Sequence, residues 1–213
     1  MLHIQKKRPS AEFRKAQQEY GHYDDLPGDR KNQLKQILIE EQDSLCAYCM
    51  VRIGMTDSSI EHYIPRKGEN GDPSLSLDYK NLLAVCENGH HENNSQCRHC
   101  DVTRGNKPLT VDPRKAAHIR TITYKADGTI CSTDEKINDD LNSEKRLNLN
   151  HPALKDARKA TVERVKLEIY KRHHGQWSKA LLQKYLDYYK GASPKISYAG
   201  IVIYELEKRL KRG

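Results

Sequence analysis

The chain has 213 residues, of which 36% are hydrophobic and 31% charged, and its formal net charge is +8. No apolar run approaches the roughly 18 residues that a membrane span needs, and residues 1–8 lack the apolar region of a secretory signal. We therefore expect a cytoplasmic protein with no membrane partner, and the positive charge favours an anionic partner such as nucleic acid.

The first 45 residues are predicted to be mainly helical. After Pro27-Gly28, Asp29 is placed to cap a helix that runs toward the first cysteine. The apolar positions of this helix recur at helical spacing: Leu34, Ile37, Leu38 and Leu45. We interpret it as a packing helix that takes no part in chemistry.

Residues 46–108 contain five of the six cysteines but no long periodic segment. Without an apolar core or an export signal, a metal ion is a better expectation here than disulfides. Cys46 and Cys49 form a C-x-x-C pair of the kind found in structural zinc sites. A thioredoxin-like redox pair is the competing interpretation, but no βαβ pattern surrounds it. The residues that can complete a tetrahedral set are Cys86, Cys97 and Cys100.

Short strands are predicted next, at residues 109–111 and 119–124, where β-forming residues gather. Asp127-Gly128 is typical of a tight turn and precedes a third short strand at residues 129–131. The polar stretch from Cys131 to Arg146 is predicted to be a flexible connector. Cys131 itself lies outside the cysteine-rich segment and is interpreted as an unligated thiol.

The chain after residues 150–152 is predicted to be helical to its end. Three apolar stripes at helical spacing indicate three helices, separated near Gly175 and at Gly191 to Pro194. The stripes consist of Leu154, Ala157, Thr161, Val165 and Ile169; of Trp177, Leu181, Tyr185 and Tyr188; and of Ala199, Ile203, Leu206 and Leu210. Basic residues between 208 and 212 suit the C-terminal dipole of the last helix.

Two carboxylates and a histidine in the cysteine-rich segment have the chemistry of a hydrolytic metal site. Glu61 directly precedes His62, and Asp101 directly follows Cys100. A hard cation such as Mg²⁺ prefers oxygen ligands, and at a phosphate it stabilises the leaving oxygen. His62, with an ordinary pKa of about 6.5, can accept a proton from water at neutral pH. In isolation this Glu-His pair would be an ordinary surface pair, but the flanking cysteines favour catalysis.

Together these elements resemble the HNH (ββα-metal) endonucleases. That family has a C-x-x-C pair, an acidic residue with His and a nearby Pro, and Asn-Leu before a cysteine. A last cysteine then precedes a metal-binding polar residue and a basic residue with Gly. The matching segments are 46–49, 60–66, 81–86 and 100–108. The resemblance implies an α+β fold, with a zinc-stapled ββα-metal core embedded among mostly helical N- and C-terminal segments.

The resemblance also implies a role for each matching residue. Glu61 and Asp101 are expected to bind the catalytic divalent ion, Mg²⁺ or Mn²⁺. His62 is expected to be the general base, and Asn81 is expected to brace the loop that holds it. Asp101 departs from the Asn or His that is more usual at its position, and Arg104 stands where Lys is common.

The zinc ligands that the resemblance selects are Cys46, Cys49, Cys86 and Cys100. The second cysteine pair of the family is compact, whereas here an insertion at residues 87–99 separates its two members. Local spacing alone favours Cys97 over Cys86, so Cys97 remains the alternative ligand. The nearby histidines are spare candidates that we interpret as solvated loop residues: His90, His91 and His99.

The order of motifs over most of the chain is similar to that of the PtuB family. These are the HNH subunits of Septu anti-phage systems, and they also occur with retrons. The similarity includes Lys6-Lys7 and Pro9 near the start, Tyr79-Lys80 ahead of Asn81, and Leu147 to Asn150 after the strand pair. It implies an ATPase partner of the PtuA kind and degradation of nucleic acid during phage infection.

The sequence therefore predicts a divalent-metal-dependent endonuclease, with DNA as the expected substrate and RNA as the open alternative. Its expected parts are a helical extension at 1–45, the nuclease core with the following hairpin at 46–131, and a helical region at 132–213 that can dock a partner. We expect Arg104 and Lys107 to contact phosphate, although the family motif does not include this contact. Two rivals stay open: a zinc module that binds nucleic acid without cutting it, and a zinc-containing scaffold for the ATPase.

Overall fold

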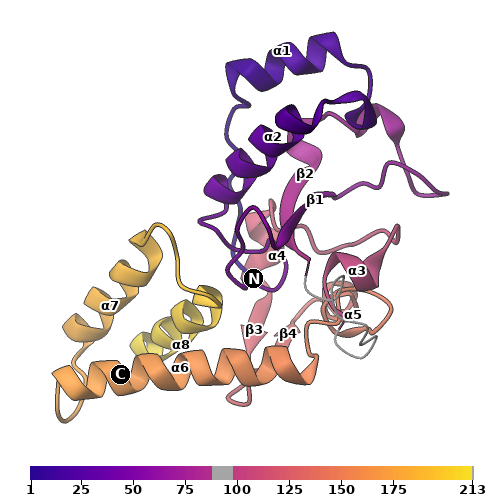
Figure 1. Ribbon diagram of the computed structural model, residues 1–213. Coiled ribbons are helices and arrows are strands. Elements are labelled where there is room, and N and C mark those ends of the chain that lie inside the picture. The colour runs from indigo at the N-terminus through magenta and orange to yellow at the C-terminus, as the bar shows by residue number, and fades with distance from the viewer. Residues whose placement is uncertain (88–97, 213) are drawn as a thin grey trace.

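The computed structural model describes residues 1–87 and 98–212 and has the predicted α+β content. Figure 1 shows α1 and α2 beside one small sheet at one end of the molecule, and a second small sheet in the middle. The long helix α6 runs along the other end, with α7 and α8 beside it. None of the helices in the described residues is long and apolar enough to cross a membrane.

Two helices form the N-terminal part. α1 spans Ala11–Glu19 and is capped by Ser10, whose hydroxyl accepts a hydrogen bond from a first-turn amide. α2 spans Gly28–Glu41 and confirms the predicted helix. The cap was predicted wrongly, because Pro27 occupies the N-cap position. Asp29 lies in the first turn, where its charge suits the helix dipole.

β1 (Ser58–His62) and β2 (Leu82–Cys86) form an antiparallel pair in which the first residue of β1 lies opposite the last residue of β2. All five residues of β2 are buried, and α2 packs against it. The amide side chain of Gln42 donates to the Ala84 carbonyl oxygen (2.8 Å) and accepts from the Ala84 backbone amide (2.8 Å). Gln42 thus pairs with the buried edge of β2, where unpaired backbone groups would be costly.

The second sheet consists of β3 (Ile122–Tyr124) and β4 (Ile130–Ser132), joined across the predicted Asp127-Gly128 turn. Gly128 has a φ of +85°, a conformation that glycine adopts readily. The turn lies on α6, where the buried side chain of Arg158 donates to the Gly128 carbonyl oxygen at 2.7 Å. This contact fixes the hairpin to the C-terminal part.

Two predictions for the neighbouring segments were wrong. Residues 109–111, all described, form no strand, because amides of this stretch donate to the carboxylate of Asp140. Residues 131–146 are not a flexible connector, because they include α5 (Glu135–Asn142), which is capped by Asp134 and buries its apolar side chains. The remaining short elements are α3 (Asp101–Arg104), α4 (Ala116–Arg120) and the 3-10 turns Tyr23–Asp25, Pro73–Leu75 and Tyr79–Asn81.

The C-terminal part consists of three helices, as predicted: α6 (Pro152–Arg172), α7 (Lys179–Gly191) and α8 (Ala199–Arg212). α6 and α8 bury most of their predicted stripes. The predicted stripe of α7 was wrong, because Tyr188 is 64% exposed. The predicted spacing starts at Trp177, which precedes the helix. The residues predicted from it therefore do not share the buried face of α7. The side chains that α7 buries are Leu182, Leu186 and Tyr189.

The contact between the hairpin turn and α6 can be tested with two glycines. Gly128 and Gly175 both have positive φ, but only at Gly128 would a Cβ atom collide with another backbone segment, at Lys155. We expect Gly175→Ala to lower the free energy of unfolding by about 1–2 kcal/mol, the cost of a left-handed conformation. Gly128→Ala should cost more than about 3 kcal/mol, since the turn must also move. Urea unfolding measures both values, and equal costs would contradict a close contact.

Candidate metal centre and active site

Four cysteines from three separate segments meet in the interior. Cys46 and Cys49 lie in the turn after α2, Cys86 ends β2, and Cys100 immediately precedes α3. All four are buried free thiols, and their Sγ atoms lie within 4.8 Å of one another. The structure therefore brings together the four residues that the sequence selects as zinc ligands.

The separations between these sulfur atoms suit a single tetrahedral ion. The Sγ atoms of Cys46 and Cys100 are 4.0 Å apart, and those of Cys49 and Cys86 are 3.7 Å apart. Tetrahedral zinc with Zn–S bonds of about 2.3 Å places its sulfurs about 3.8 Å apart. A disulfide would require about 2.05 Å. The cluster can therefore bind a metal ion such as zinc.

Backbone hydrogen bonds connect the cysteine cluster to distant parts of the chain. The Met50 amide donates to the Cys46 carbonyl oxygen (3.1 Å) and closes the C-x-x-C turn. The Met50 carbonyl oxygen accepts from the Tyr198 amide (2.8 Å), just before α8. The Cys100 amide donates to the Leu147 carbonyl oxygen (2.8 Å), in the segment that leads to α6. The cluster thus joins the first sheet to the C-terminal helices.

One nearby histidine corrects a prediction. Cys97, the alternative ligand, lies outside the described residues, as do His90 and His91. His99 was predicted to be solvated, but it is only 6% exposed. Its Nδ1 lies 3.1 Å from Cys100 Sγ. A hydrogen-bond donor at this position would stabilise the sulfur as a thiolate and orient it toward a metal.

Glu61 and Asp101 lie close together next to this cluster. Glu61 comes from β1 and is 7% exposed, and Asp101 is the first residue of α3. Burial raises the pKa of Glu61 to about 8, and the negative charge of Asp101 adds to this effect, while the charge of Arg104 opposes it. Carboxylate oxygens are the ligands that Mg²⁺ and Mn²⁺ prefer, and a divalent cation would relieve the repulsion between them. The pair can therefore hold such an ion.

Arg104 is buried and is engaged by its neighbours. It forms an ion pair with Glu61 and donates to the Tyr48 hydroxyl (3.1 Å). It also donates to the carbonyl oxygens of Tyr63 and of Lys107, the latter at 2.8 Å. The phosphate contact expected of Arg104 would therefore require its ion pair to break. Lys107, by contrast, is exposed and accessible to a phosphate.

His62 follows Glu61 on β1 and contacts a different set of neighbours. Its Nε2 lies 2.9 Å from the Ser76 carbonyl oxygen, and its ring packs edge-on against Tyr23, with 4.9 Å between ring centroids. Because a carbonyl oxygen only accepts hydrogen bonds, Nε2 carries the proton and Nδ1 is the basic nitrogen. Burial lowers the pKa of His62 to about 4, so the ring is neutral at pH 7. Successive strand residues point to opposite faces, so the side chain of His62 lies on the face of β1 opposite to that of Glu61, among different neighbours.

Asn81 fixes the segment that follows His62. Its Oδ1 accepts from the Ile64 amide (2.7 Å), and its Nδ2 donates to the carbonyl oxygens of Ile64 (3.0 Å) and Leu75 (3.2 Å). The Asn81 carbonyl oxygen also accepts from the Tyr63 amide (2.9 Å). Asn81 is thus placed as a brace for the loop after His62.

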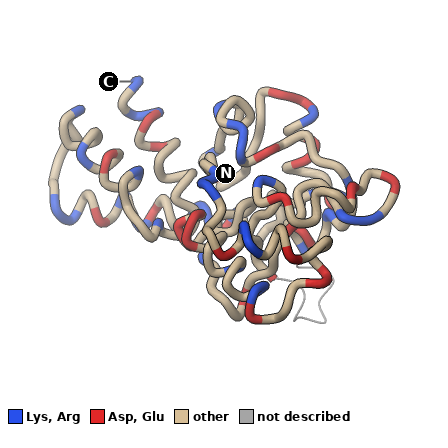
Figure 2. The backbone as a smooth tube through the Cα atoms, turned by 90° about the horizontal axis from the view of Figure 1, so that it is seen from above, with Lys and Arg blue, Asp and Glu red and all other residues tan. Residues whose placement is uncertain are grey.

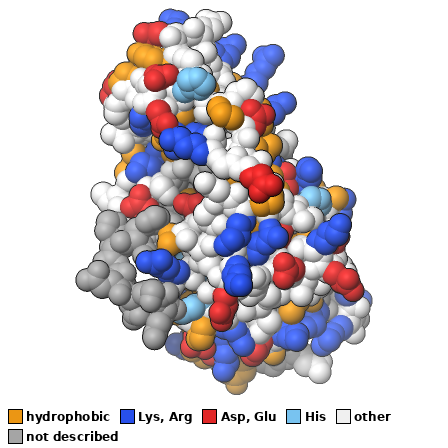
Figure 3. All heavy atoms as spheres, turned by 90° about the vertical axis from the view of Figure 1, so that its right-hand side faces the viewer, with side chains coloured by type: hydrophobic (Ala, Val, Ile, Leu, Met, Phe, Trp, Pro, Cys, Tyr) orange, Lys and Arg blue, Asp and Glu red, His pale blue; other side chains and the backbone are white. Residues whose placement is uncertain are grey.

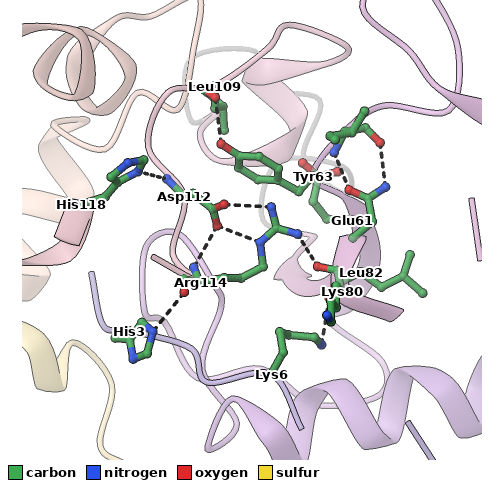
Figure 4. A network of polar contacts seen from close by, with 12 residues as sticks. His3, Lys6, Glu61, Tyr63, Lys80, Leu82, Leu109, Asp112, Arg114 and His118 are labelled. Carbon is green, nitrogen blue, oxygen red and sulfur yellow. Dashed lines mark hydrogen bonds and ion pairs between the residues drawn. The ribbon is translucent and has the colours of Figure 1, made fainter. Parts of the chain in front are cut away.

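A network around Arg114 escaped sequence analysis (Figure 4). The guanidinium group donates twice to the Asp112 carboxylate (2.8 and 2.9 Å) and lies over the Tyr63 ring, 4.3 Å from its centroid. Tyr63 in turn donates to the Leu109 carbonyl oxygen (2.8 Å). The network holds the segment after α3 against the loop after His62. Tyr63 lies 46 positions before Leu109, so no local pattern indicates the whole network.

Comparison with known proteins gives one distant relative. No family model matches the chain. The chain is similar to a Vibrio cholerae serotype O1 biovar El Tor protein named "Retron Vc95 putative HNH endonuclease", with 26% identity over 128 residues. The match covers 58% of this chain and 60% of that protein, so the chain spans less than two thirds of the length of its relative. The similarity supports the HNH family and a nuclease function.

The cysteine cluster predicts a content of about one zinc ion per chain. Cys86→Ser is expected to lose most of this zinc, because it removes one of four converging sulfurs. Cys131→Ser is the control, since Cys131 is a free cysteine outside the cluster. Elemental analysis of the purified variants measures the difference. Zinc lost from Cys97→Ser but retained in Cys86→Ser would assign the fourth ligand to Cys97.

Arg104 and Lys107 allow a buried cation to be compared with an exposed one. Arg104→Met removes the contact with Glu61 and leaves the Tyr63 and Lys107 carbonyl oxygens without a donor, so we expect the free energy of unfolding to fall by about 3–5 kcal/mol. Lys107→Met should change it by no more than about 0.5 kcal/mol. Chemical unfolding of the zinc-loaded protein measures both. Small effects for both variants would contradict a structural role for Arg104.

Proposed function

We propose that this chain is a divalent-metal-dependent endonuclease with an HNH (ββα-metal) site, and that it hydrolyses phosphodiester bonds in DNA. The observation that carries the proposal is the proximity of Glu61 and Asp101, which come from β1 and α3 and lie beside four clustered cysteines. The chain order β1, β2, α3 supports it. The similarity to a protein named as an HNH endonuclease supports it as well.

The residues present fit two different metals. The four thiols suit a structural zinc ion, and the oxygens of Glu61 and Asp101 suit Mg²⁺ or Mn²⁺. A divalent ion bound by these oxygens supplies positive charge to the scissile phosphate and to the leaving oxygen. Tyr48 donates to Glu61 Oε1 at 3.0 Å, and Arg104 forms an ion pair with the same oxygen. Both residues thereby hold the carboxylate in one orientation.

His62 has the properties of a general base. The Ser76 carbonyl oxygen holds the proton on Nε2, which leaves Nδ1 to accept a proton from the attacking water. Its lowered pKa keeps the ring neutral at pH 7, so Nδ1 is free of a proton, and it also makes the ring a weaker base than an exposed imidazole. Asn81 positions the loop that follows. Lys107 is exposed and would contact the phosphate backbone.

We also propose that the nuclease acts in an anti-phage defence system with an ATPase subunit of the PtuA kind. Two observations support this role. The order of motifs is similar to that of the PtuB family, and the similar Vibrio cholerae protein is named as part of a retron. The helical regions 1–45 and 132–213 would provide the docking surface. Co-purification with an ATPase encoded beside this chain tests this part. Failure to form a complex would contradict the partnership and leave the nuclease proposal intact.

A cleavage assay tests the nuclease proposal. Plasmid DNA incubated with the protein, and with its ATPase partner where one is found, should be cut only when Mg²⁺ or Mn²⁺ is added. His62→Ala, Glu61→Gln and Asp101→Asn should each lower the rate by roughly 10²–10⁴-fold. The control is Glu144→Gln, which changes an exposed carboxylate on the surface. Zinc content and circular dichroism establish that the variants are folded. Undiminished cleavage by His62→Ala would refute the assigned base.

A further inference from the structure

A hollow at the far end of the molecule has a lining unlike that of an ordinary packing gap. It lies between the end of α6, the loop that leads to α7 and the last turns of α8, and its volume is about 820 Å³. This end lies away from α3 (Figure 1). The lining residues that matter here are Tyr170, Trp177, Lys179, Lys208, Arg209 and Arg212.

The charge of this lining is mostly positive. It includes four cationic side chains and one acidic side chain, that of Glu205, which lies 3.8 Å from Lys208. Within residues 1–87 and 98–212, the structure gives no ion pair to Lys179, Arg209 or Arg212. Figure 2 shows basic positions at the C-terminal tip of the chain. On the face in Figure 3, by contrast, Lys and Arg are interspersed with Asp and Glu.

The helix dipole accounts for only some of these cations. Basic side chains in the last turn of α8 are stabilised by the negative end of that helix. Lys179, however, is the first residue of α7, where the positive end of the dipole disfavours a cation. An anionic ligand in the hollow would offset this unfavourable charge.

Aromatic rings lie among these cations. Tyr170 is 55% exposed, and its ring packs edge-on against His174, with 5.6 Å between the ring centroids. Trp177 is partly buried against the helices, and the guanidinium group of Arg209 lies 5.0 Å from its ring. Exposed rings among unpaired cations are the combination by which proteins bind single-stranded nucleic acid, because bases stack on the rings and phosphates meet the cations.

We propose that this hollow binds a single-stranded stretch of nucleic acid. A base would stack on Tyr170, close to Trp177, and phosphates would contact Lys179, Arg209 and Arg212. A duplex keeps its base faces stacked inside, and an acidic peptide has no base faces, so neither would make use of the rings. The inference rests on the proposed nuclease function and adds to it a second contact with the substrate, distant from Glu61.

The single tryptophan of the chain makes a direct test possible, because Trp177 lines the hollow. Oligo(dT) of 15 nucleotides is titrated into the zinc-loaded full chain without added divalent ion, and the emission of Trp177 is recorded. We expect saturable quenching, with an affinity at least about tenfold above that of a 15-base-pair duplex or a polyglutamate peptide. Fluorescence anisotropy of the labelled oligonucleotide measures the same affinity independently.

Matched variants separate a specific site from general attraction. Lys179→Glu/Arg212→Glu should weaken oligonucleotide binding by at least about tenfold. Lys15→Glu/Lys145→Glu changes the net charge equally at two exposed positions outside the hollow and should leave binding nearly unchanged. Tyr170→Ala should weaken binding by roughly 5- to 100-fold, since it removes one stacking ring but no charge. A thermal melt establishes that each variant is folded.

The outcomes distinguish this inference from the proposed function. The inference would be overturned if both charge-reversed double variants lost oligonucleotide affinity equally. It would also be overturned if polyglutamate quenched Trp177 as strongly as oligo(dT). His62→Ala should bind oligo(dT) normally, because it lies outside the hollow. If oligo(dT) binds at the hollow but the protein never cuts nucleic acid, the proposed nuclease function is refuted and the binding site stands. Metal-dependent cutting with no response of Trp177 would refute the hollow alone.

Discussion

The convergence of four cysteine sulfurs is the constraint on which the rest of the structure depends. In the described residues between α2 and α3, the elements are the two five-residue strands β1 and β2 and two short 3-10 turns, and a hairpin of this size is marginally stable by itself. A structural zinc ion contributes on the order of 10 kcal/mol when bound, which is comparable to the whole stability of a typical domain, about 5–15 kcal/mol. Sulfur–metal bonds would therefore add to the apolar contacts of this segment, in which every residue of β2 is buried. They would also hold the C-x-x-C turn, the end of β2 and the start of α3 in fixed positions.

The same constraint fixes the two carboxylates. Tyr48 lies inside the C-x-x-C turn and donates to Glu61, and Asp101 directly follows Cys100. One hydrogen bond thus connects Glu61 to the C-x-x-C turn, and one peptide bond connects Asp101 to Cys100. Two neighbouring carboxylates, of which Glu61 is buried, repel each other without positive charge, and Arg104 supplies part of that charge from α3. Arg104 is therefore part of the charge balance of the carboxylate pair.

The sequence predicts elements whose cause is local and misses those whose cause lies elsewhere in the fold. α2 follows from its apolar spacing, and the hairpin turn follows from Asp127-Gly128, because neighbouring residues decide both. The cysteine cluster is predictable because a metal ion needs the same set of ligands regardless of the sequence between them. Arg104 was expected to contact phosphate, because a sequence shows the charge of a residue and not the direction of its side chain. α5 was missed because its stability comes from packing Ile137 and Leu141, which its polar composition conceals.

The long helix α6 relates the two regions of proposed nucleic-acid contact. The first turns of α6 follow Leu147, whose carbonyl oxygen accepts a hydrogen bond from the Cys100 amide. Its last turns border the hollow lined by Tyr170 and Trp177. A helix of 21 residues is about 31 Å long at a rise of about 1.5 Å per residue. A strand that contacts both regions would have to bridge a distance set by this helix. A rigid helix of this length would hold substrate at a fixed distance from Glu61 and Asp101. Short fragments would then occupy one region without reaching the other.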